Sequence, residues 1–208
     1  MITKCDIRVY DAMIGKIVKV FTELLPTNKK FNPEITKVSR GARYRKIYVG
    51  DNAGFVRLYN MKNCEFLKNV NKLEEETKNI RRIGELTFSD LKNSDDHDVS
   101  CMLYLPDEKM LVVGTVDSVI KIYDEADSDE SALSRIFIGG HRETQICSLA
   151  YNTEYLQLAS GSDNGMVCLW DFQSGRLEAV FYNHVSSIRE LLFLYPYPVL
   201  ASISNDGT

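Results

Sequence analysis

The clearest pattern in the chain is a series of short apolar runs, separated by turn residues, between positions 139 and 182. Short runs bounded by Gly, Asn, Asp and Ser are typical of strands. Asp163-Asn164-Gly165 predicts a hairpin turn, because Asn-Gly supplies the positive φ angles that such a turn needs. We expect antiparallel strands at residues 145–151, 156–160, 166–171 and 177–182.

The same arrangement recurs along the chain. Gly140-His141 opens this unit and Trp170-Asp171 ends its third strand. The next histidine, His184, follows at the spacing of about 40–45 residues that one propeller blade occupies. Weaker copies precede the unit and a partial copy follows it. The period therefore predicts repeated four-stranded sheets arranged about an axis, as in a β-propeller.

We predict an all-β chain in which a single β-propeller contains three full blades and two half-blades. The expected parts are a half-blade at 1–22, blades at 35–70, 97–138 and 139–182, a charged insertion at 71–96 and a half-blade at 183–208. The insertion could contain a short strand at 84–89 or a turn of helix at 74–80. The half-blades either complete each other in a four-bladed ring or belong to a larger propeller, and we expect the larger propeller.

Composition and net charge indicate which class of protein the chain belongs to and which partners are not expected. The chain has 208 residues, of which 44% are apolar and 26% charged, as in an ordinary globular domain. Its net charge of −4 argues against a nucleic-acid partner, and its apolar runs are too short to cross a membrane. The five cysteines are scattered and odd in number, which is typical of free thiols in a reducing compartment such as the cytoplasm.

Four stretches resemble the WD-repeat family of β-propellers: VGTVDSVIKIYDE, GGHRETQICSLAYN, SGSDNGMVCLWDFQSGRLEAV and ELLFLYPYPVLASISNDG. They are similar, more narrowly, to large propeller proteins, some with EF-hand segments, found in organisms with motile cilia. In that subfamily an aromatic-Pro-Tyr-Pro corner precedes the second strand, and Tyr-Asp-Glu often replaces Trp-Asp. The resemblance implies a protein-interaction scaffold of the cilium or axoneme, with axonemal or microtubule-associated proteins as partners.

In blades of this family, a His, a Ser or Thr of the second strand, an Asp at the hairpin turn and the Trp of the third strand form a hydrogen-bond relay. The resemblance implies this structural role, and neither catalysis nor metal binding, for His141, Ser160, Asn164 and Trp170, for His184, Ser202 and Asp206, and for His97 and Asp117. Asn164 stands where an Asp is usual, and Val113 replaces the hydroxyl beside Asp117. Three histidines at equivalent places of three repeats are what a repeated architecture produces.

Two places are candidates for contact with a protein partner. Arg81 and Arg82 lie in the charged insertion, and arginine is enriched at the cores of interfaces. Tyr195 and Tyr197 belong to a Tyr-Pro-Tyr-Pro corner between two expected strands. We expect this corner to be stiff and to expose both rings.

The alternative function is that of a substrate-recruiting subunit of a ubiquitin ligase. Propellers of that type that dock on a propeller adaptor tend to carry Trp-Asp-x-Arg, whereas Phe172 and Gln173 follow Trp170-Asp171 here. An enzyme would need polar groups or metal ligands that converge on the central channel, and the expected inner strands offer mainly small and apolar residues. We therefore expect no catalytic residue, no cofactor and no small-molecule substrate.

Overall fold

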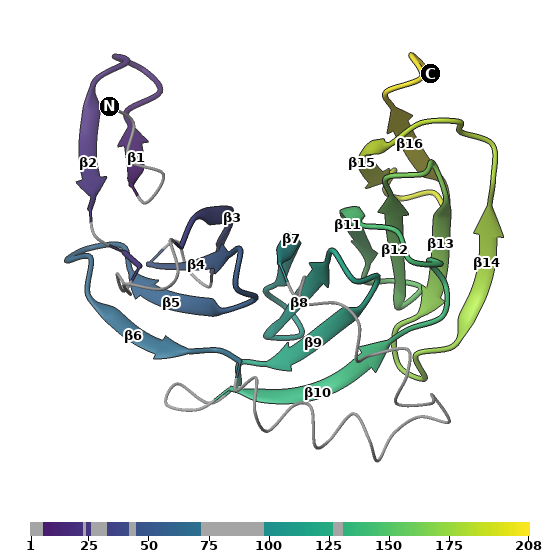
Figure 1. Cartoon of the computed structure of the whole chain (residues 1–208), viewed down its shortest axis with the longest axis horizontal. Helices are drawn as coiled ribbons and strands as arrows, with labels where there is room; N and C mark the ends of the chain where they lie inside the picture. The colour runs from purple at the N-terminus through teal and green to yellow at the C-terminus, as the bar shows by residue number, and fades with distance from the viewer. Residues whose placement is uncertain (1–5, 23, 26–32, 42–44, 72–97, 127–130) are drawn as a thin grey trace.

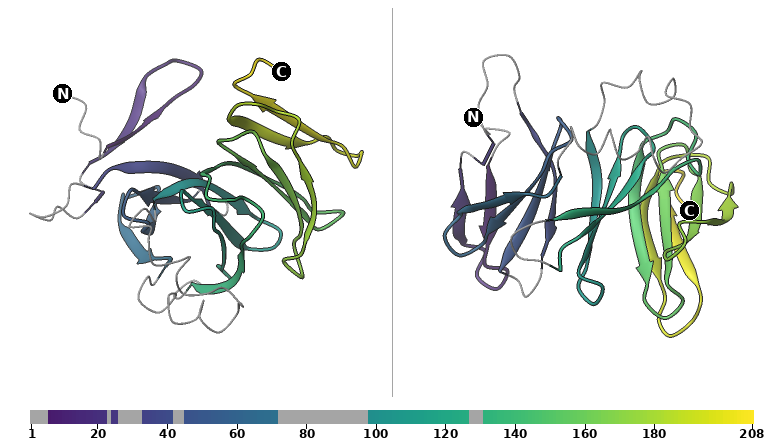
Figure 2. Two further views of the ribbon diagram at one scale, coloured as in Figure 1. Left: turned by 45° about the vertical axis from the view of Figure 1, so that its right-hand side comes forward. Right: turned by 90° about the horizontal axis from the view of Figure 1, so that it is seen from below.

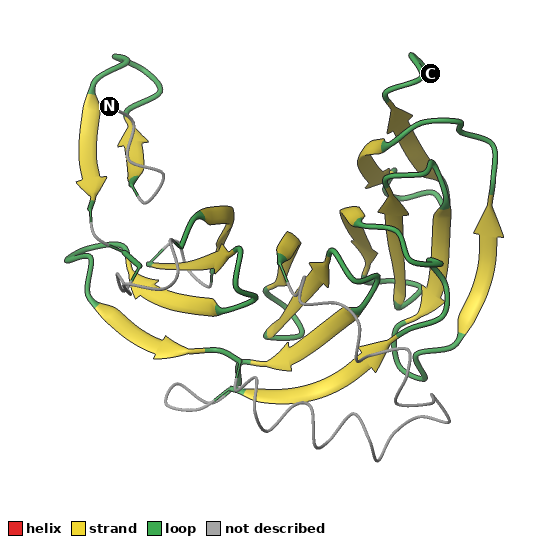
Figure 3. Cartoon of the chain, in the orientation of Figure 1, coloured by secondary structure: helices red, strands yellow, loops and turns green. Residues whose placement is uncertain are grey.

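A computed structural model describes residues 6–22, 24–25, 33–41, 45–71, 98–126 and 131–208. Within these ranges all the regular secondary structure is β-strand, as Figure 3 shows. The described residues contain no helix of the length and apolar character that a membrane span requires. The strand or helix considered for the insertion falls on residues outside these ranges.

The strands are short and follow one another in chain order. They are β1 (Ile7–Tyr10), β2 (Ile17–Phe21), β3 (Ile35–Arg40), β4 (Lys46–Asp51), β5 (Val56–Asn60), β6 (Phe66–Asn69), β7 (Val99–Leu105), β8 (Met110–Thr115), β9 (Ile120–Asp124), β10 (Ala132–Phe137), β11 (Ile146–Asn152), β12 (Gln157–Ser162), β13 (Val167–Asp171), β14 (Leu177–Phe181), β15 (Ile188–Phe193) and β16 (Leu200–Ser204). The strands expected between positions 139 and 182 correspond to β11–β14, with ends that differ by two residues at most.

Each sheet is an antiparallel meander. Three four-stranded sheets contain β3–β6, β7–β10 and β11–β14, and two-stranded sheets contain β1–β2 and β15–β16. The sheets follow one another along an open arc, with β1–β2 on one arm and β15–β16 on the other (Figure 1). The first strands β3, β7, β11 and β15 contact one another in turn and lie on the inner side of the arc. The prediction of an all-β propeller with three full blades and two half-blades is confirmed.

Neighbouring sheets pack closely because their second strands carry glycine at one repeated place. A Cβ built on Gly50 would lie 2.6 Å from Val99 Cγ1 of the next sheet, and one built on Gly161 would lie 2.5 Å from Ile188 Cγ2. Gly114 stands in the same relation to Ile146, at 3.0 Å. Because glycine has no side chain, a β-branched residue at the start of the following sheet occupies the space beside it.

β16 departs from this rule. Ile203 pairs with Glu190 as Gly161 pairs with Ser148, so Ile203 occupies the place that glycine has in the full sheets. Its side chain is 56% exposed. A further sheet on this side therefore cannot approach β16 as closely as β15 approaches β12.

The apolar core is divided into clusters, each of which lies between two adjacent sheets. Between β7–β10 and β11–β14, the ring of Phe137 stacks on Trp170 with centroids 5.5 Å apart. Separate clusters join the other neighbouring sheets, and the views in Figure 2 show the sheets standing side by side. Burial of apolar surface between successive sheets is thus what holds the arc together.

Candidate functional site

The sheet β11–β14 contains a buried hydrogen-bond relay. The distance between His141 Nε2 and Ser160 Oγ is 2.7 Å, and Trp170 Nε1 donates to the same Oγ at 2.8 Å. At most 3% of each of the three residues is exposed. Because a buried polar group without a partner costs about 1–3 kcal/mol, this shared oxygen stabilises the entry loop, the second strand and the third strand together.

The environment keeps His141 neutral. Burial lowers its pKa to about 4, well below the usual value of a histidine. Its other ring nitrogen, Nδ1, lies 3.8 Å from Cys168 Sγ. Since Ser160 Oγ accepts the indole hydrogen, its own hydrogen can point to Nε2 of the neutral ring, so the group is arranged as a structural tie.

Asn164 lies at the expected hairpin turn, but its side chain bonds within the turn and not to His141. Its side-chain oxygen accepts hydrogen bonds from Ser162 Oγ at 2.6 Å and from the backbone N–H of Met166 at 3.2 Å. The asparagine therefore closes its own hairpin turn, and the thiol of Cys168 stands beside His141 instead. This corrects the expected relay at one of its four members.

A second relay lies in β15–β16. His184 Nε2 is 2.8 Å from Ser202 Oγ, and His184 Nδ1 is 3.0 Å from Asp206 Oδ2. The same carboxylate oxygen accepts the backbone N–H of Val185 at 3.0 Å. A hydrogen bond from the Thr208 hydroxyl, with those from Val185 and His184, holds the pKa of Asp206 well below its usual range. The three expected residues are thus brought together here, with an ionised carboxylate beside the imidazole.

The sheet β7–β10 is built differently. Asp117 and the backbone oxygen of Val119 both lie within hydrogen-bond distance of the Thr115 hydroxyl, so Asp117 closes a turn in this sheet as well. Val113 takes the place of Ser160, and Tyr123, only 1% exposed, takes the place of Trp170. His97 lies outside the described residues, and its place in a relay stays a prediction.

The sheet β3–β6 contains a buried ion pair that was not predicted from the sequence. Asp51, at the end of β4, pairs with Arg57 of β5, and their side chains are 1% and 9% exposed. The Asp51 carboxylate also accepts the backbone N–H groups of Ala53 and Phe55 at 3.0 and 2.9 Å. An acid just before a turn and a base just after it were the signal that could have revealed this pair.

A second missed cluster joins two sheets. Tyr48 of β4 donates to Glu125 Oε2 at 3.2 Å, and Lys68 of β6 forms an ion pair with the same oxygen at 3.4 Å. Glu125 follows β9 in the next sheet, and its side chain is 4% exposed. Burial, together with this carboxylate, raises the pKa of Tyr48. Because the three residues are far apart in the chain, no local sequence signal reveals the cluster.

The described cysteines are free thiols. Cys101 and Cys168 are buried, whereas Cys64 and Cys147 are half-buried, and Cys5 lies outside the described residues. Burial raises the pKa of Cys101 and Cys168 to about 12, so both stay protonated. Within the described ranges, no group of three or more His, Cys, Asp or Glu side chains could hold a metal ion.

The tyrosine corner between β15 and β16 projects from the sheet. Tyr195 is 77% exposed and Tyr197 is 66% exposed. Backbone hydrogen bonds from Leu194 to Val199 and from Tyr197 to Leu194, each 2.9 Å long, close the corner. With the exposed side chains of Leu194 and Val199, the two rings form an apolar patch, called the tyrosine corner below. Arg81 and Arg82 lie outside the described residues.

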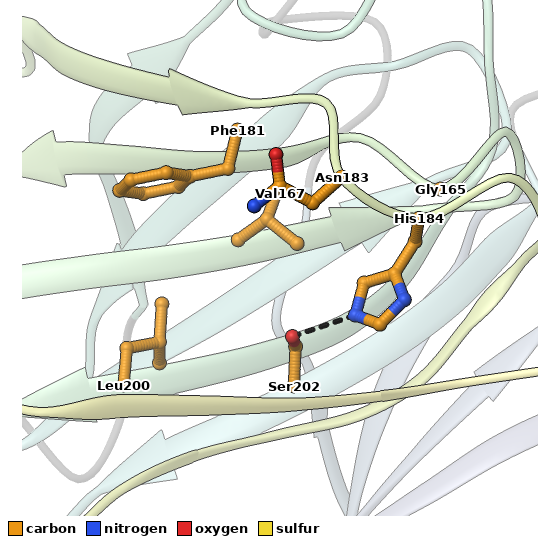
Figure 4. A pocket seen from close by; sticks show the side chains of 7 residues that line it. All are labelled: Gly165, Val167, Phe181, Asn183, His184, Leu200 and Ser202. Carbon is orange, nitrogen blue, oxygen red and sulfur yellow. Dashed lines mark hydrogen bonds between the residues drawn. The ribbon is translucent and has the colours of Figure 1, made fainter. Parts of the chain in front are cut away.

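A pocket of about 350 Å³ opens between β14 and β16. Figure 4 shows the ring of Phe181 and the His184–Ser202 hydrogen bond on its walls. The pocket is lined by Gly165, Val167, Phe181, Asn183, His184, Leu200 and Ser202. One wall is thus aromatic, and another presents the relay of β15–β16.

Residues 88–124 and 133–171 match the family described as WD domain, G-beta repeat. These two segments are WD40 repeats. The second match spans β11–β13 and ends at Trp170-Asp171, and the first ends at Tyr123-Asp124. WD40 repeats form propellers that typically bind other proteins without catalysing a reaction.

Curated proteins are similar to parts of the chain. Meiotic fizzy-related protein 2 of Schizosaccharomyces pombe is 28% identical over 67% of this chain, which covers 23% of that protein. Nuclear distribution protein nudF 2 of Aspergillus clavatus is 35% identical over 36% of this chain, covering 18% of that protein. WD repeat-containing protein 90 of Xenopus tropicalis is 37% identical over 34% of this chain, covering 4% of that protein. The chain thus spans less than a quarter of the length of these relatives.

Two solved structures have similar folds. One chain of a mitotic checkpoint complex superimposes with a TM-score of 0.68 at 18% identity, over 95% of this chain and 50% of that chain. The computationally designed protein Ika4 superimposes with a TM-score of 0.57 at 17% identity, over 83% of this chain and 88% of that one. At this level of identity the similarity concerns the fold alone.

Proposed function

We propose that this protein is a non-catalytic scaffold that binds other proteins in the cytoplasm, and that it is a component of the cilium or axoneme. The tyrosine corner is the observation that carries the scaffold role. Tyr195 and Tyr197 expose most of their surface on a hairpin that is anchored in a sheet. Tyrosines are enriched among the residues that contribute most to protein–protein binding, so the corner is the proposed partner contact.

The way the sheet is anchored supports this role. Ile188, at the start of β15, is 1% exposed and packs on Gly161 of the preceding sheet. The backbone N–H of Leu191 donates to Ser148 Oγ of that sheet at 3.0 Å. A surface held in this way loses little conformational freedom when it binds, which favours affinity.

The ciliary assignment is supported by the resemblance of four sequence stretches, one of which contains the tyrosine corner, to propeller proteins of organisms with motile cilia. Tubulin-associated axonemal proteins are therefore the proposed partners. Arg81 and Arg82 stay a second proposed contact, on the grounds of residue type and of their place in a charged insertion.

Proximity labelling of the intact protein in ciliated cells tests the proposal. We expect tubulin and axonemal proteins to be recovered with the unchanged chain, and to be lost when Tyr195 and Tyr197 are both replaced by alanine. Tyr182→Ala is the matched control, because Tyr182 is 69% exposed and directly follows β14, outside the tyrosine corner. Recovery of a ubiquitin-ligase adaptor in place of axonemal proteins would contradict the proposal and favour the alternative function.

A further inference from the structure

Three basic side chains lie together at one end of the sheet β3–β6, where β4 begins and β5 ends. Arg45 directly precedes β4, Lys46 is its first residue, and Lys62 lies in the turn between β5 and β6. The backbone N–H of Met61 donates to the carbonyl oxygen of Arg45 at 2.8 Å, and Lys46 pairs with Asn60. The three basic residues therefore form one surface, called the basic rim below.

The turn that presents Lys62 is fixed from both sides. The side-chain oxygen of Asn60 accepts the backbone N–H of Lys62 at 2.8 Å, and the backbone N–H of Cys64 donates to the carbonyl oxygen of Asn60 at 3.0 Å. Met61 and Cys64, on either side of the exposed positions of the turn, pack against the apolar cluster that contains Tyr59. A partner that binds Lys62 therefore has to order little more than its side chain.

Lys19 of β2 brings a further positive charge to this turn from the preceding sheet. Its Nζ donates to the carbonyl oxygen of Met61 at 3.4 Å and also to that of Lys62. The sheet β3–β6 lies between β1–β2 and β7–β10 along the arc (Figure 1). The basic rim therefore lies in the body of the arc, on a sheet whose four strands are all present.

The charges of the basic rim are available to a partner. Arg45 and Lys62 are exposed and Lys46 is half-buried. In the part of the chain that the structure describes, no carboxylate forms an ion pair with any of the three. The acid of the same turn, Glu65, instead accepts a hydrogen bond from the Asn63 side chain at 2.7 Å. Several like charges thus lie close together without neutralisation, which favours the approach of an anionic group.

The other full sheets have no comparable group of bases. Glu125 donates to the carbonyl oxygen of Lys109, and Phe172 to that of Leu156, as Met61 does to that of Arg45. These bonds, with the pairing of the strands, identify the corresponding places. They hold Lys109, Met110 and Ala126 in β7–β10, and Leu156, Gln157 and Gln173 in β11–β14. The fold therefore does not require bases at these places.

Carboxylates at the same end of β7–β10 limit the size of an anionic partner. Asp107 and Glu108 shortly precede β8, and Asp124 ends β9. The chain as a whole has a net charge of −4. A long polyanion such as a nucleic acid would extend from the basic rim onto these carboxylates and be repelled. A short acidic segment fits the basic rim better.

We infer that the basic rim binds a short segment of a partner protein that is rich in Asp and Glu. This inference rests on the proposed scaffold role and names the chemistry of one partner contact. Carboxylates of the segment accept hydrogen bonds from the Arg45 guanidinium and from the ammonium groups of Lys46 and Lys62. Because the basic rim is exposed, the contact weakens as salt is added.

Fluorescence polarisation with a labelled polyglutamate peptide and the full chain tests the inference at low ionic strength. We expect saturable binding that Arg45→Glu combined with Lys62→Glu weakens at least about tenfold, because like charges then meet. Arg142→Glu combined with Arg176→Glu is the matched control. It makes the same change of net charge at exposed residues of the β11–β14 unit and should leave the affinity unchanged. Circular dichroism verifies that the sheets of each variant are intact.

A carbodiimide cross-link locates the bound peptide, since it joins a carboxylate to a lysine that it contacts. Mass spectrometry should find the peptide attached to Lys46 or Lys62. Absence of binding, equal weakening by the two pairs of substitutions, or attachment to lysines spread over the surface would overturn the inference. So would tighter binding of single-stranded DNA at the same residues.

The tyrosine corner separates this test from that of the scaffold role. Tyr195→Ala combined with Tyr197→Ala should leave the affinity for polyglutamate unchanged. If the peptide does not bind while axonemal proteins are still lost in this tyrosine variant, the basic rim is ruled out and the scaffold role is kept. If the peptide binds at the basic rim and no protein partner is recovered from cells, the scaffold role fails instead.

Discussion

Gly161 of β12 lies directly against Ile188 of β15, and a Cβ on Gly161 would come within 2.5 Å of Ile188 Cγ2. The same relation joins Gly50 to Val99 and Gly114 to Ile146. The spacing between sheets is therefore set by a residue without a side chain.

We expect Gly161→Ala to destabilise the chain by about 1–3 kcal/mol, because overpacking displaces the next sheet. Urea denaturation measures the loss. Ile188→Ala removes the opposing atoms, so the double variant should lose less stability than the sum of the two single variants. Additive losses would show that the two residues do not limit the approach of the sheets.

Ser160 offers one oxygen to two buried partners. Ser160→Ala leaves the indole N–H of Trp170 and one nitrogen of His141 without this partner, and we expect a loss of about 1–3 kcal/mol in the free energy of unfolding. Trp170→Phe should lower the free energy of unfolding less in the Ser160→Ala background than in the unchanged chain, because the hydrogen bond from Trp170 to Ser160 is already absent there. An equal cost in both backgrounds would contradict the relay.

The buried His141 predicts a loss of stability in mild acid. Its pKa is lowered to about 4 by burial, whereas the unfolded chain takes up the proton near pH 6.5. The contribution of the neutral His141 ring to the free energy of unfolding is fully present above pH 6.5. It falls as the pH drops from 6.5 towards 4, by about 3 kcal/mol in total.

Urea denaturation between pH 7.5 and 4 measures this effect, and His141→Gln should remove most of the slope. Asp171 and Asp206, whose pKa values are lowered by hydrogen bonds from Ser174 and Thr208, titrate below this window. An unchanged slope in His141→Gln would assign the acid sensitivity to other groups.

Because Asp51 and Arg57 form a buried ion pair, we expect removal of one charge to lower the free energy of unfolding more than removal of both charges. Arg57→Met leaves a buried carboxylate with backbone N–H partners alone, and we expect a loss of about 3 kcal/mol. Asp51→Asn combined with Arg57→Met removes both charges and should restore part of that loss. A double variant less stable than Arg57→Met would contradict this account of the pair.

The sequence predicts the repeated sheets well because strand length, turn residues and the spacing of His141 and Trp170 are local features. His184, Ser202 and Asp206 were expected as a group because of the resemblance to the WD-repeat family, and the structure brings them together. The expected bond between Asn164 and the histidine of its relay was wrong, because the side chain of a turn residue can bond to the nearest hydroxyl, here that of Ser162. Glu125, Lys68 and Tyr48 meet only after two sheets have packed, so their association depends on tertiary structure.

The sheets are joined as propeller blades, and the hydrogen-bond relay of His141, Ser160 and Trp170 stabilises the blade formed by β11–β14. Since the chain has one tryptophan, its indole N–H gives a single NMR resonance that reports on this relay. We predict that this proton exchanges slowly with solvent at pH 7 and that Ser160→Ala accelerates its exchange. Rapid exchange in the unchanged protein, as for an exposed indole, would contradict the account.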